Sequence, residues 1–177
     1  MLPENIVLRG QKVILLDFGP EDITVDYISW LNDIEVVRYS NQRLIRHTEQ
    51  SCRNYLRSFA GTPSRFLKIV MADSGKAVGT MTAYAVPAHQ TVDMGILLGA
   101  RTVWGQGIGR DAWETLLHWL ICTVGVRKVT AGAMRCNVAM VRIMEGSGMK
   151  LEAVRRGQEL LEGVAQDLVY YGIFRDD

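Results

Sequence analysis

The alternation of apolar and polar positions is clearest between residues 91 and 99. The apolar side chains at even positions share one face of an extended chain: Val92, Met94, Ile96 and Leu98. The other face carries Asp93, Gly95 and Leu97. This period of two predicts a β-strand, with one carboxylate, Asp93, on the face opposite the apolar row.

A second pattern begins a few residues later and has the period of a helix. Its apolar residues recur at spacings of three and four: Ala112, Trp113, Leu116, Leu117, Leu120, Ile121 and Val124. The spacing predicts an amphipathic helix that begins within or just after a glycine-rich stretch and continues to about residue 124.

The other segments give the order of the predicted fold. Apolar or alternating runs between turn residues predict strands at 10–18, 66–72, 77–86, 127–136, 150–156 and 166–174. Helical spacing predicts shorter helices at 23–31, 48–59 and 137–146, with Thr48 as an N-cap. Consecutive hairpins followed by strand–helix–strand units favour a mixed, mostly antiparallel sheet flanked by helices, in the α/β (α+β) class.

The glycine-rich stretch between the strand and the long helix is the strongest candidate for a binding site. Gly105, Gly107 and Gly109 occupy alternate positions immediately before the helix. Glycine permits turn conformations closed to other residues and lets the backbone approach a ligand closely. Because a helix N-terminus presents free N–H groups and a positive dipole, this loop predicts a site for an anion such as phosphate.

Two common phosphate loops do not fit. Residues 107–112 match the dinucleotide pattern GxGxxG/A, but the next strand ends at Met134 to Asn137 without the acid that holds a ribose. A run of hairpins before the loop is also the wrong architecture for an NAD-binding oxidoreductase. A Walker A loop would need Lys after its last glycine, and Gly109 is followed by Arg110 and Asp111.

Composition narrows the class further. The 177 residues are 48% hydrophobic and carry a net charge of +1, which fits one globular domain spanning residues 1–177. The small net charge disfavours nucleic acid as a partner. Cys52, Cys122 and Cys136 lack metal-ligand spacing, so neither a disulfide framework nor a metal site is expected. With no signal-peptide pattern and no membrane-length apolar run, we expect a cytoplasmic protein without a membrane partner.

The segment from Asp93 to Leu98, the loop Trp104–Arg110, Asn137 and the closing stretch Gly146–Met149 resemble the acetyl-CoA core of the GNAT superfamily of N-acetyltransferases. The Trp-Gly-x-Gly-x-Gly form is similar to the branch that contains ribosomal-protein N-terminal and amino-sugar acetyltransferases. The resemblance implies splayed central strands that hold acetyl-CoA, and a homodimer as one arrangement to test. The residues implied to bind the cofactor are Ile96, Leu97, Leu98, Trp104, Gly105, Gln106, Gly107, Ile108, Gly109, Arg110, Asn137 and Arg142.

Acetyl transfer to a primary amine needs a group to accept the amine proton and stabilisation of the oxyanion. Asp93 occupies the strand position where many family members carry a glutamate base, and His47 is a second candidate from the loop side. The usual tyrosine acid is replaced by Met144. Tyr84 and Tyr39 are candidate substitutes, and a non-catalytic acetyl-CoA-binding module is an alternative.

The acceptor is predicted from the loop between the first two helices. Its cationic and hydrogen-bonding side chains suit a small amine that carries phosphate and hydroxyl groups. We therefore favour a nucleotide-linked amino sugar over the alternative, a protein N-terminus. The predicted substrate-binding residues are Arg38, Tyr39, Asn41, Arg43 and Tyr84.

Overall fold

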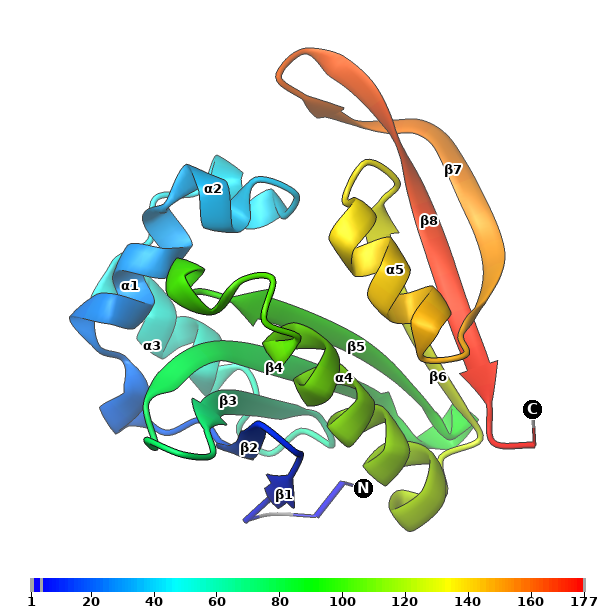
Figure 1. Ribbon diagram of the computed structural model, residues 1–177, viewed down its shortest axis with the longest axis horizontal. Coiled ribbons are helices and arrows are strands. Elements are labelled where there is room, and N and C mark those ends of the chain that lie inside the picture. The colour runs from blue at the N-terminus through cyan, green and yellow to red at the C-terminus, as the bar shows by residue number, and fades with distance from the viewer. Residues whose placement is uncertain (1, 4, 177) are drawn as a thin grey trace.

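The protein folds around one sheet whose neighbouring strands are antiparallel at every pair but one. The computed structural model describes residues 2–3 and 5–176, so positions 1, 4 and 177 of the predicted domain lie outside the described residues. Within that part of the chain the sheet has eight strands in the order β1-β2-β3-β4-β5-β6-β8-β7, and only β5 and β6 pair in parallel (Figure 1). The strands are β1 Val7–Arg9, β2 Val13–Asp17, β3 Arg65–Met71, β4 Ala77–Val86, β5 Thr91–Leu98, β6 Lys128–Met134, β7 Lys150–Leu161 and β8 Val164–Phe174. The predicted fold class is confirmed.

Helices cover both faces of this sheet. They are α1 Val25–Asn32, α2 Ile34–Val37, α3 Glu49–Arg57, α4 Ile108–His118 and α5 Val138–Gly146. α1 and α3 pack on one face through a cluster that includes Tyr27, Cys52 and Phe66. α4 and α5 pack on the other face, because the apolar row of β5 and the buried side of α4 belong to the same larger cluster.

Most predicted elements are present, and the differences lie where the sequence pattern is weak. β4 has the predicted bounds, and Thr48 caps α3 by accepting a hydrogen bond from the Ser51 amide at 3.2 Å. The predicted helix to residue 124 continues beyond α4 as the π-helical turn Trp119–Val124. β1 was not predicted, and β7 extends five residues past the predicted end at residue 156, to Leu161.

The stretch 32–47 was predicted as a loop and contains more structure than that. α2 occupies Ile34–Val37, and a short 3-10 turn, η2, occupies Asn41–Leu44. Both begin at a side-chain cap, Asp33 for α2 and Ser40 for η2. Such short turns are stabilised by local caps, so apolar periodicity gives no signal for them.

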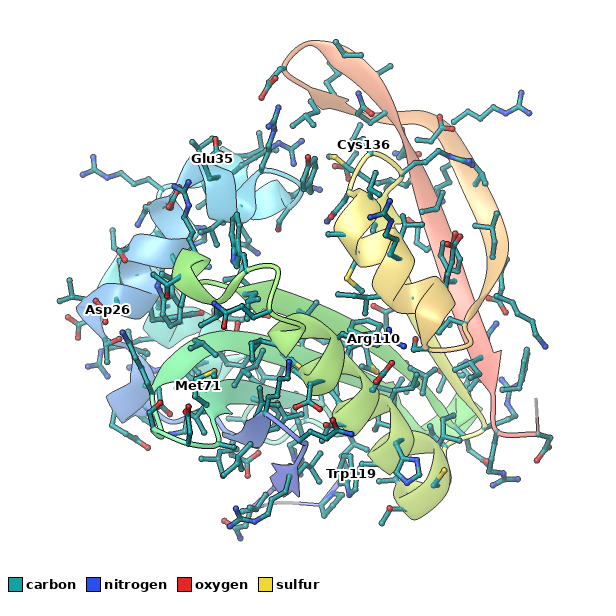
Figure 2. The ribbon with its side chains drawn as sticks, viewed as in Figure 1. Asp26, Glu35, Met71, Arg110, Trp119 and Cys136 are labelled. Atoms are coloured by element: carbon teal, nitrogen blue, oxygen red, sulfur yellow. The ribbon has the colours of Figure 1, made fainter. Side chains whose placement is uncertain are left out.

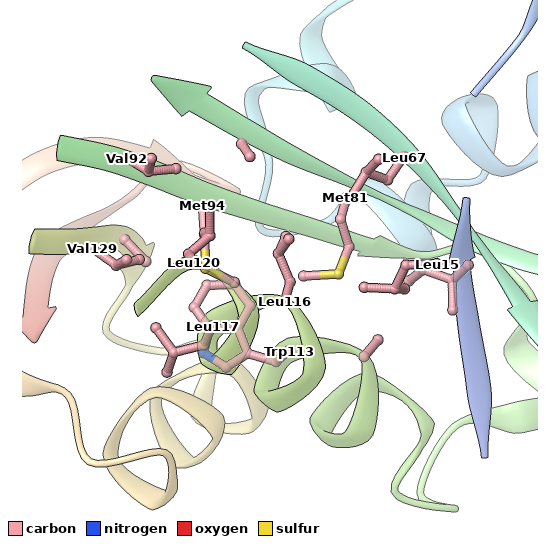
Figure 3. Packing of buried hydrophobic residues seen from close by; sticks show 14 of the residues in the cluster. Leu15, Leu67, Met81, Val92, Met94, Trp113, Leu116, Leu117, Leu120 and Val129 are labelled. Atoms are coloured by element: carbon pink, nitrogen blue, oxygen red, sulfur yellow. The ribbon is translucent and has the colours of Figure 1, made fainter. Parts of the chain in front are cut away.

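The larger core fixes α4 against the middle of the sheet. Trp113, Leu116 and Leu120 are fully buried, and they pack with Met81 of β4 and Met94 of β5 (Figure 3). Burying side chains of this size contributes about 1.5–3 kcal/mol each. The N-terminus of α4 is therefore held beside the end of β5. Among the described residues, no helix combines the length and apolarity that a membrane span needs.

Candidate active site

The central feature of the site is the separation of β5 from β6. The two strands pair only through Thr91–Lys128, Val92–Val129 and Asp93–Thr130. Beyond Asp93, β5 stays paired with β4 as far as Leu98, whereas β6 stays paired with β8 as far as Met134. Figure 1 shows the strands starting together and then diverging. The edge of β5 from Met94 to Leu98 that faces β6 is therefore open to pair with an extended ligand.

The glycine loop lies at the wide end of this gap. Gly105 and Gly107 have φ of 73° and 79°, in the left-handed region that glycine adopts without strain. Gly107 is the N-cap of α4, and the amides of Ile108, Gly109 and Arg110 donate to no backbone carbonyl among the described residues. The local geometry is that of an anion-binding helix start.

Side chains of the loop hold it in place. The Trp104 indole Nε1 donates to the Leu98 carbonyl at 2.9 Å, which joins the loop to the end of β5. The side-chain Nε2 of Gln106 donates to the Thr102 carbonyl at 2.8 Å. Arg110 forms an ion pair with Glu114 and lies beside Gly146, on the side of α4 that faces α5 (Figure 2). The backbone amides, not these side chains, therefore face the predicted phosphate.

The remaining predicted cofactor residues border the gap from both sides. Ile96 and Leu98 project toward Gly109 and the α4 face, whereas Leu97 packs in the cluster on the opposite face. Asn137 follows β6 and caps α5 by accepting a hydrogen bond from the Met140 amide at 3.2 Å. Arg142 is exposed on α5. The structure thus brings the predicted cofactor residues to β5, the glycine loop, the start of α4 and α5.

A cavity of about 440 Å³ adjoins β5 on the face opposite α4. Its walls come from α1, the 40–47 segment, α3, β3, β4 and residues Gly95, Ile96 and Leu97 of β5. The hydroxyl-bearing residues among them are Tyr27, Ser40, Ser51, Tyr55, Thr80, Thr82 and Tyr84. Of these, only Tyr84 was predicted as a site residue, although Thr80, Thr82 and Tyr84 alternate along one face of a predicted strand and could have been recognised.

Two tyrosines in the cavity wall share a hydrogen bond. The hydroxyls of Tyr55 and Tyr84 are 2.5 Å apart. Burial raises the pKa of Tyr55 well above the usual tyrosine value, and the pKa of Tyr27 is raised for the same reason. The hydroxyls of Tyr55 and Tyr27 are therefore protonated at neutral pH and can donate hydrogen bonds.

His47 is placed in the same wall by contacts of its backbone and ring. Its amide donates to Asn32 Oδ1 at 2.9 Å, and Asn32 Nδ2 donates to the His47 carbonyl at the same distance. The ring Nε2 lies 3.3 Å from the Gln42 carbonyl, so an Nε2–H tautomer would donate there and leave Nδ1 as the acceptor. Among the predicted catalytic and substrate-binding residues, His47 and Tyr84 line the cavity.

Asp93 lies where β5 and β6 part, outside the cavity wall but directly across from Tyr84 in the β4–β5 pairing. Its Oδ2 accepts a hydrogen bond from the Thr130 hydroxyl at 2.7 Å. Asp93 is exposed as a residue, but desolvation of its carboxyl by the atoms packed around it raises the pKa above its ordinary range, while the bond from Thr130 acts in the opposite direction. A carboxyl whose proton affinity is raised in this way is better suited to accept a proton.

The polar residues of the 38–43 segment contact the β7–β8 hairpin, and their role in substrate binding stays a prediction. Arg43 donates to the Leu160 carbonyl at 2.9 Å, Asn41 donates to Glu159 at 2.9 Å, and Arg38 pairs with Glu162 at 3.1 Å. These contacts join the segment to the tip of the β7–β8 hairpin. Tyr39 lies beneath the Arg38 guanidinium, whose centre is 5.8 Å from the ring. Unlike His47 and Tyr84, the residues Arg38, Tyr39, Asn41 and Arg43 do not line the cavity.

Met144 also bears on the chemistry. Its side chain is fully buried in the larger core, on the α4 side of the sheet. A thioether carries no proton to donate. Any acid that protonates a leaving thiolate must therefore come from another position.

The family follows from a comparison with known domains. Residues 12–150 match the acetyltransferase (GNAT) domain. The chain therefore belongs to the GNAT acetyltransferases, the acetyl-CoA-dependent N-acetyltransferases. This confirms the resemblance inferred from the glycine loop and its neighbours. No curated protein matches the sequence significantly.

Solved structures show the same fold at low sequence identity. A GNAT-family acetyltransferase from Bacillus anthracis is 17% identical with a TM-score of 0.82, and the match covers 97% of this chain and 100% of that one. RimL, a ribosomal L7/L12 alpha-N-protein acetyltransferase solved with coenzyme A, is 14% identical with a TM-score of 0.83, covering 96% and 98%. Spermidine N-acetyltransferase from Vibrio cholerae, solved with CoA and spermine, is 14% identical with a TM-score of 0.82, covering 93% and 96%.

The left-handed glycine at the helix start gives a first test. Gly107→Ala places a Cβ in a conformation that costs an L-residue about 1–2 kcal/mol, and the loop will shift to relieve it. We expect the dissociation constant for CoA, measured by calorimetry, to rise roughly 5- to 10-fold, the equivalent of 1.0–1.4 kcal/mol.

Gly75→Ala is the matched control. Gly75 has φ of 67° in the β3–β4 turn, and nothing lies within 4 Å of an added Cβ. It should lower the free energy of unfolding by a similar amount and leave CoA affinity unchanged. Equal affinities for the two variants would contradict the assignment of the loop.

Proposed function

We propose that this enzyme transfers the acetyl group of acetyl-CoA to the primary amine of an amino sugar, free or nucleotide-linked, or of a similar hydroxylated small amine. The observation that carries the proposal is the cavity of about 440 Å³. It opens onto Gly95, Ile96 and Leu97 of β5, the strand that also carries Asp93. Its wall combines aromatic rings with hydroxyl groups, the pair of features that suits a sugar ring with its apolar faces and polar edge.

The charge of the wall supports an acceptor without additional ammonium groups. Among the described residues that line the cavity, there is one histidine, His47, and no lysine, arginine, aspartate or glutamate. A polyamine would need carboxylates to balance its second and third charges. The hydroxyl groups of a sugar carry no charge, so the hydroxyls of the wall can hydrogen-bond to them without any carboxylate.

The phosphate part of a nucleotide sugar has weaker support than the sugar ring. The arginines predicted to bind it are engaged by the hairpin, and the Arg43 side chain is only 8% exposed. Arg46 remains exposed in the same segment. The sugar ring is therefore the part of the acceptor that the cavity explains best.

In the proposed reaction, the neutral amine attacks the acetyl carbonyl carbon and forms the new C–N bond. Asp93 accepts the amine proton through a water molecule, and the C–S bond then breaks to release the CoA thiolate. Tyr84 lies across from Asp93 and can donate a proton to the thiolate, while its hydroxyl remains close to that of Tyr55. Acetyl-CoA is the donor substrate, and no covalent enzyme intermediate is needed.

A protein N-terminus is the second candidate acceptor. Leu44 and Ile45, in the segment that lines the cavity, are 73% and 56% exposed, and Leu160 on the facing hairpin tip is 63% exposed. Exposed aliphatic side chains around an opening suit the contacts of a peptide. A panel of acceptors for this enzyme should therefore include peptides with free N-termini.

The Asp93 carboxylate predicts a pH dependence. It must be ionised to accept a proton, and its pKa is raised, so kcat/KM should increase with pH over a window above the ordinary aspartate range. Asp93→Asn should lower kcat by roughly 100-fold and abolish that rise. Thr130→Val removes the hydrogen bond that lowers this pKa, so the rise should move to higher pH.

These predictions are checked by measuring pre-steady-state and steady-state thiol release across the pH range. The proteins compared are the wild type, Asp93→Asn and Thr130→Val. His47→Gln provides the comparison, since His47 is the other candidate base. An unaltered profile in Asp93→Asn, together with its loss in His47→Gln, would transfer the role to the histidine.

The acceptor is tested by thiol release from acetyl-CoA with a panel of amines. The panel contains free amino sugars, nucleotide-linked amino sugars, spermidine and peptides with free N-termini. We expect the highest kcat/KM with an amino sugar. Tyr84→Phe should lower it by roughly 10-fold, whereas Tyr39→Phe, outside the cavity wall, should not. Acetylation of peptides alone would overturn the sugar proposal, and no turnover with any amine would favour a non-catalytic module.

A further inference from the structure

Lys12 reaches the glycine loop from a distant part of the chain. It stands at the turn between β1 and β2, and its Nζ donates to the Gln106 carbonyl at 2.7 Å. A Cβ built on Gly107 would lie 3.4 Å from the same Nζ. The ammonium group is therefore adjacent to the residue that caps α4 and begins its row of free amides.

The turn that carries Lys12 is fixed to the same helix. The Asp111 carboxylate, in the first turn of α4, accepts hydrogen bonds from the backbone amides of Gln11, Lys12 and Val13 at 3.0, 2.8 and 3.1 Å. Gly10 makes room for this contact, because a Cβ there would lie 2.5 Å from Asp111 Oδ2. Both the backbone and the ammonium of Lys12 are thus held to the start of α4.

Lys12 presents a cation beside the loop, whereas the charged side chains of the first turn of α4 are directed elsewhere. Asp111 is the acidic residue of the first turn, and its carboxylate is directed to the 11–13 amides. The Arg110 guanidinium pairs with Glu114 at 2.7 Å. An ammonium has three N–H groups, and Gln106 accepts one, so two can bind phosphate oxygens.

We propose that Lys12 is a diphosphate-binding residue of the acetyl-CoA site, positioned by Asp111. The proposal rests on acetyl-CoA as the donor substrate but not on any acceptor. The loop amides and the dipole of α4 bind the diphosphate oxygens, and Lys12 adds the full positive charge that those partial charges lack. Asp111 acts as a positioning residue, because it fixes the backbone from which the lysine extends.

The test is the affinity of Lys12→Met and Lys12→Arg for three ligands, measured by calorimetry without any acceptor. The ligands are CoA, dephospho-CoA, which lacks the 3′-phosphate, and pantetheine, which lacks all phosphates. Lys12→Met should weaken CoA and dephospho-CoA equally, by roughly 10-fold, and leave pantetheine unchanged. Lys12→Arg should retain most of the affinity. The dependence of CoA binding on salt should become shallower in Lys12→Met.

Arg57→Met is the control for loss of one positive charge, since Arg57 is exposed at the end of α3 on the opposite face of the sheet. It should leave all three affinities unchanged. A larger loss for CoA than for dephospho-CoA would assign Lys12 to the 3′-phosphate and overturn the diphosphate assignment. An equal loss for pantetheine would show that the lysine only supports the loop. If the wild-type protein binds none of the three ligands, the donor assignment itself fails.

Discussion

The site depends on one constraint, the parting of β5 and β6 after three paired residues. A continuous sheet would satisfy the β5 edge with the neighbouring strand and leave no backbone for an extended ligand. The separation is stabilised from both sides, because β5 remains paired with β4 and β6 with β8. Asp93 and Thr130 form the last pair before the gap and also share a side-chain hydrogen bond. The proposed base, Asp93, therefore lies where the two strands separate.

In the proposed arrangement, the two faces of β5 serve the two substrates. Its apolar row packs with α4 and keeps the helix N-terminus beside the wide end of the gap, where a phosphate can bind. Its other face forms part of the hydroxyl-lined cavity together with β4, α3 and the 40–47 segment. A donor bound along the strand edge would place its acetyl group near that cavity, which explains how one strand can organise both halves of the reaction.

The sequence was informative wherever local pattern determines structure. The alternation from Val92 to Leu98 and the glycines before α4 were sufficient to predict the central strand, the glycine loop at the start of α4 and the family. Other features depend on contacts between residues far apart in sequence. Lys12 meets Gln106 across 94 positions, and Arg43 meets Leu160 across 117. Arginine in a polar loop carries the same signal whether it binds substrate or a hairpin, so the contacts of Arg38, Asn41 and Arg43 with the hairpin could not be predicted from the sequence.

The most direct test is amide hydrogen exchange on the protein with and without saturating CoA. The account predicts slower exchange at the amides of Met94 to Leu98 that face the gap and at those of residues 105–110, with little change in α3. Unchanged exchange in both segments at saturation, or protection confined to other parts of the chain, would contradict the claim that the open edge of β5 and the glycine loop bind the donor.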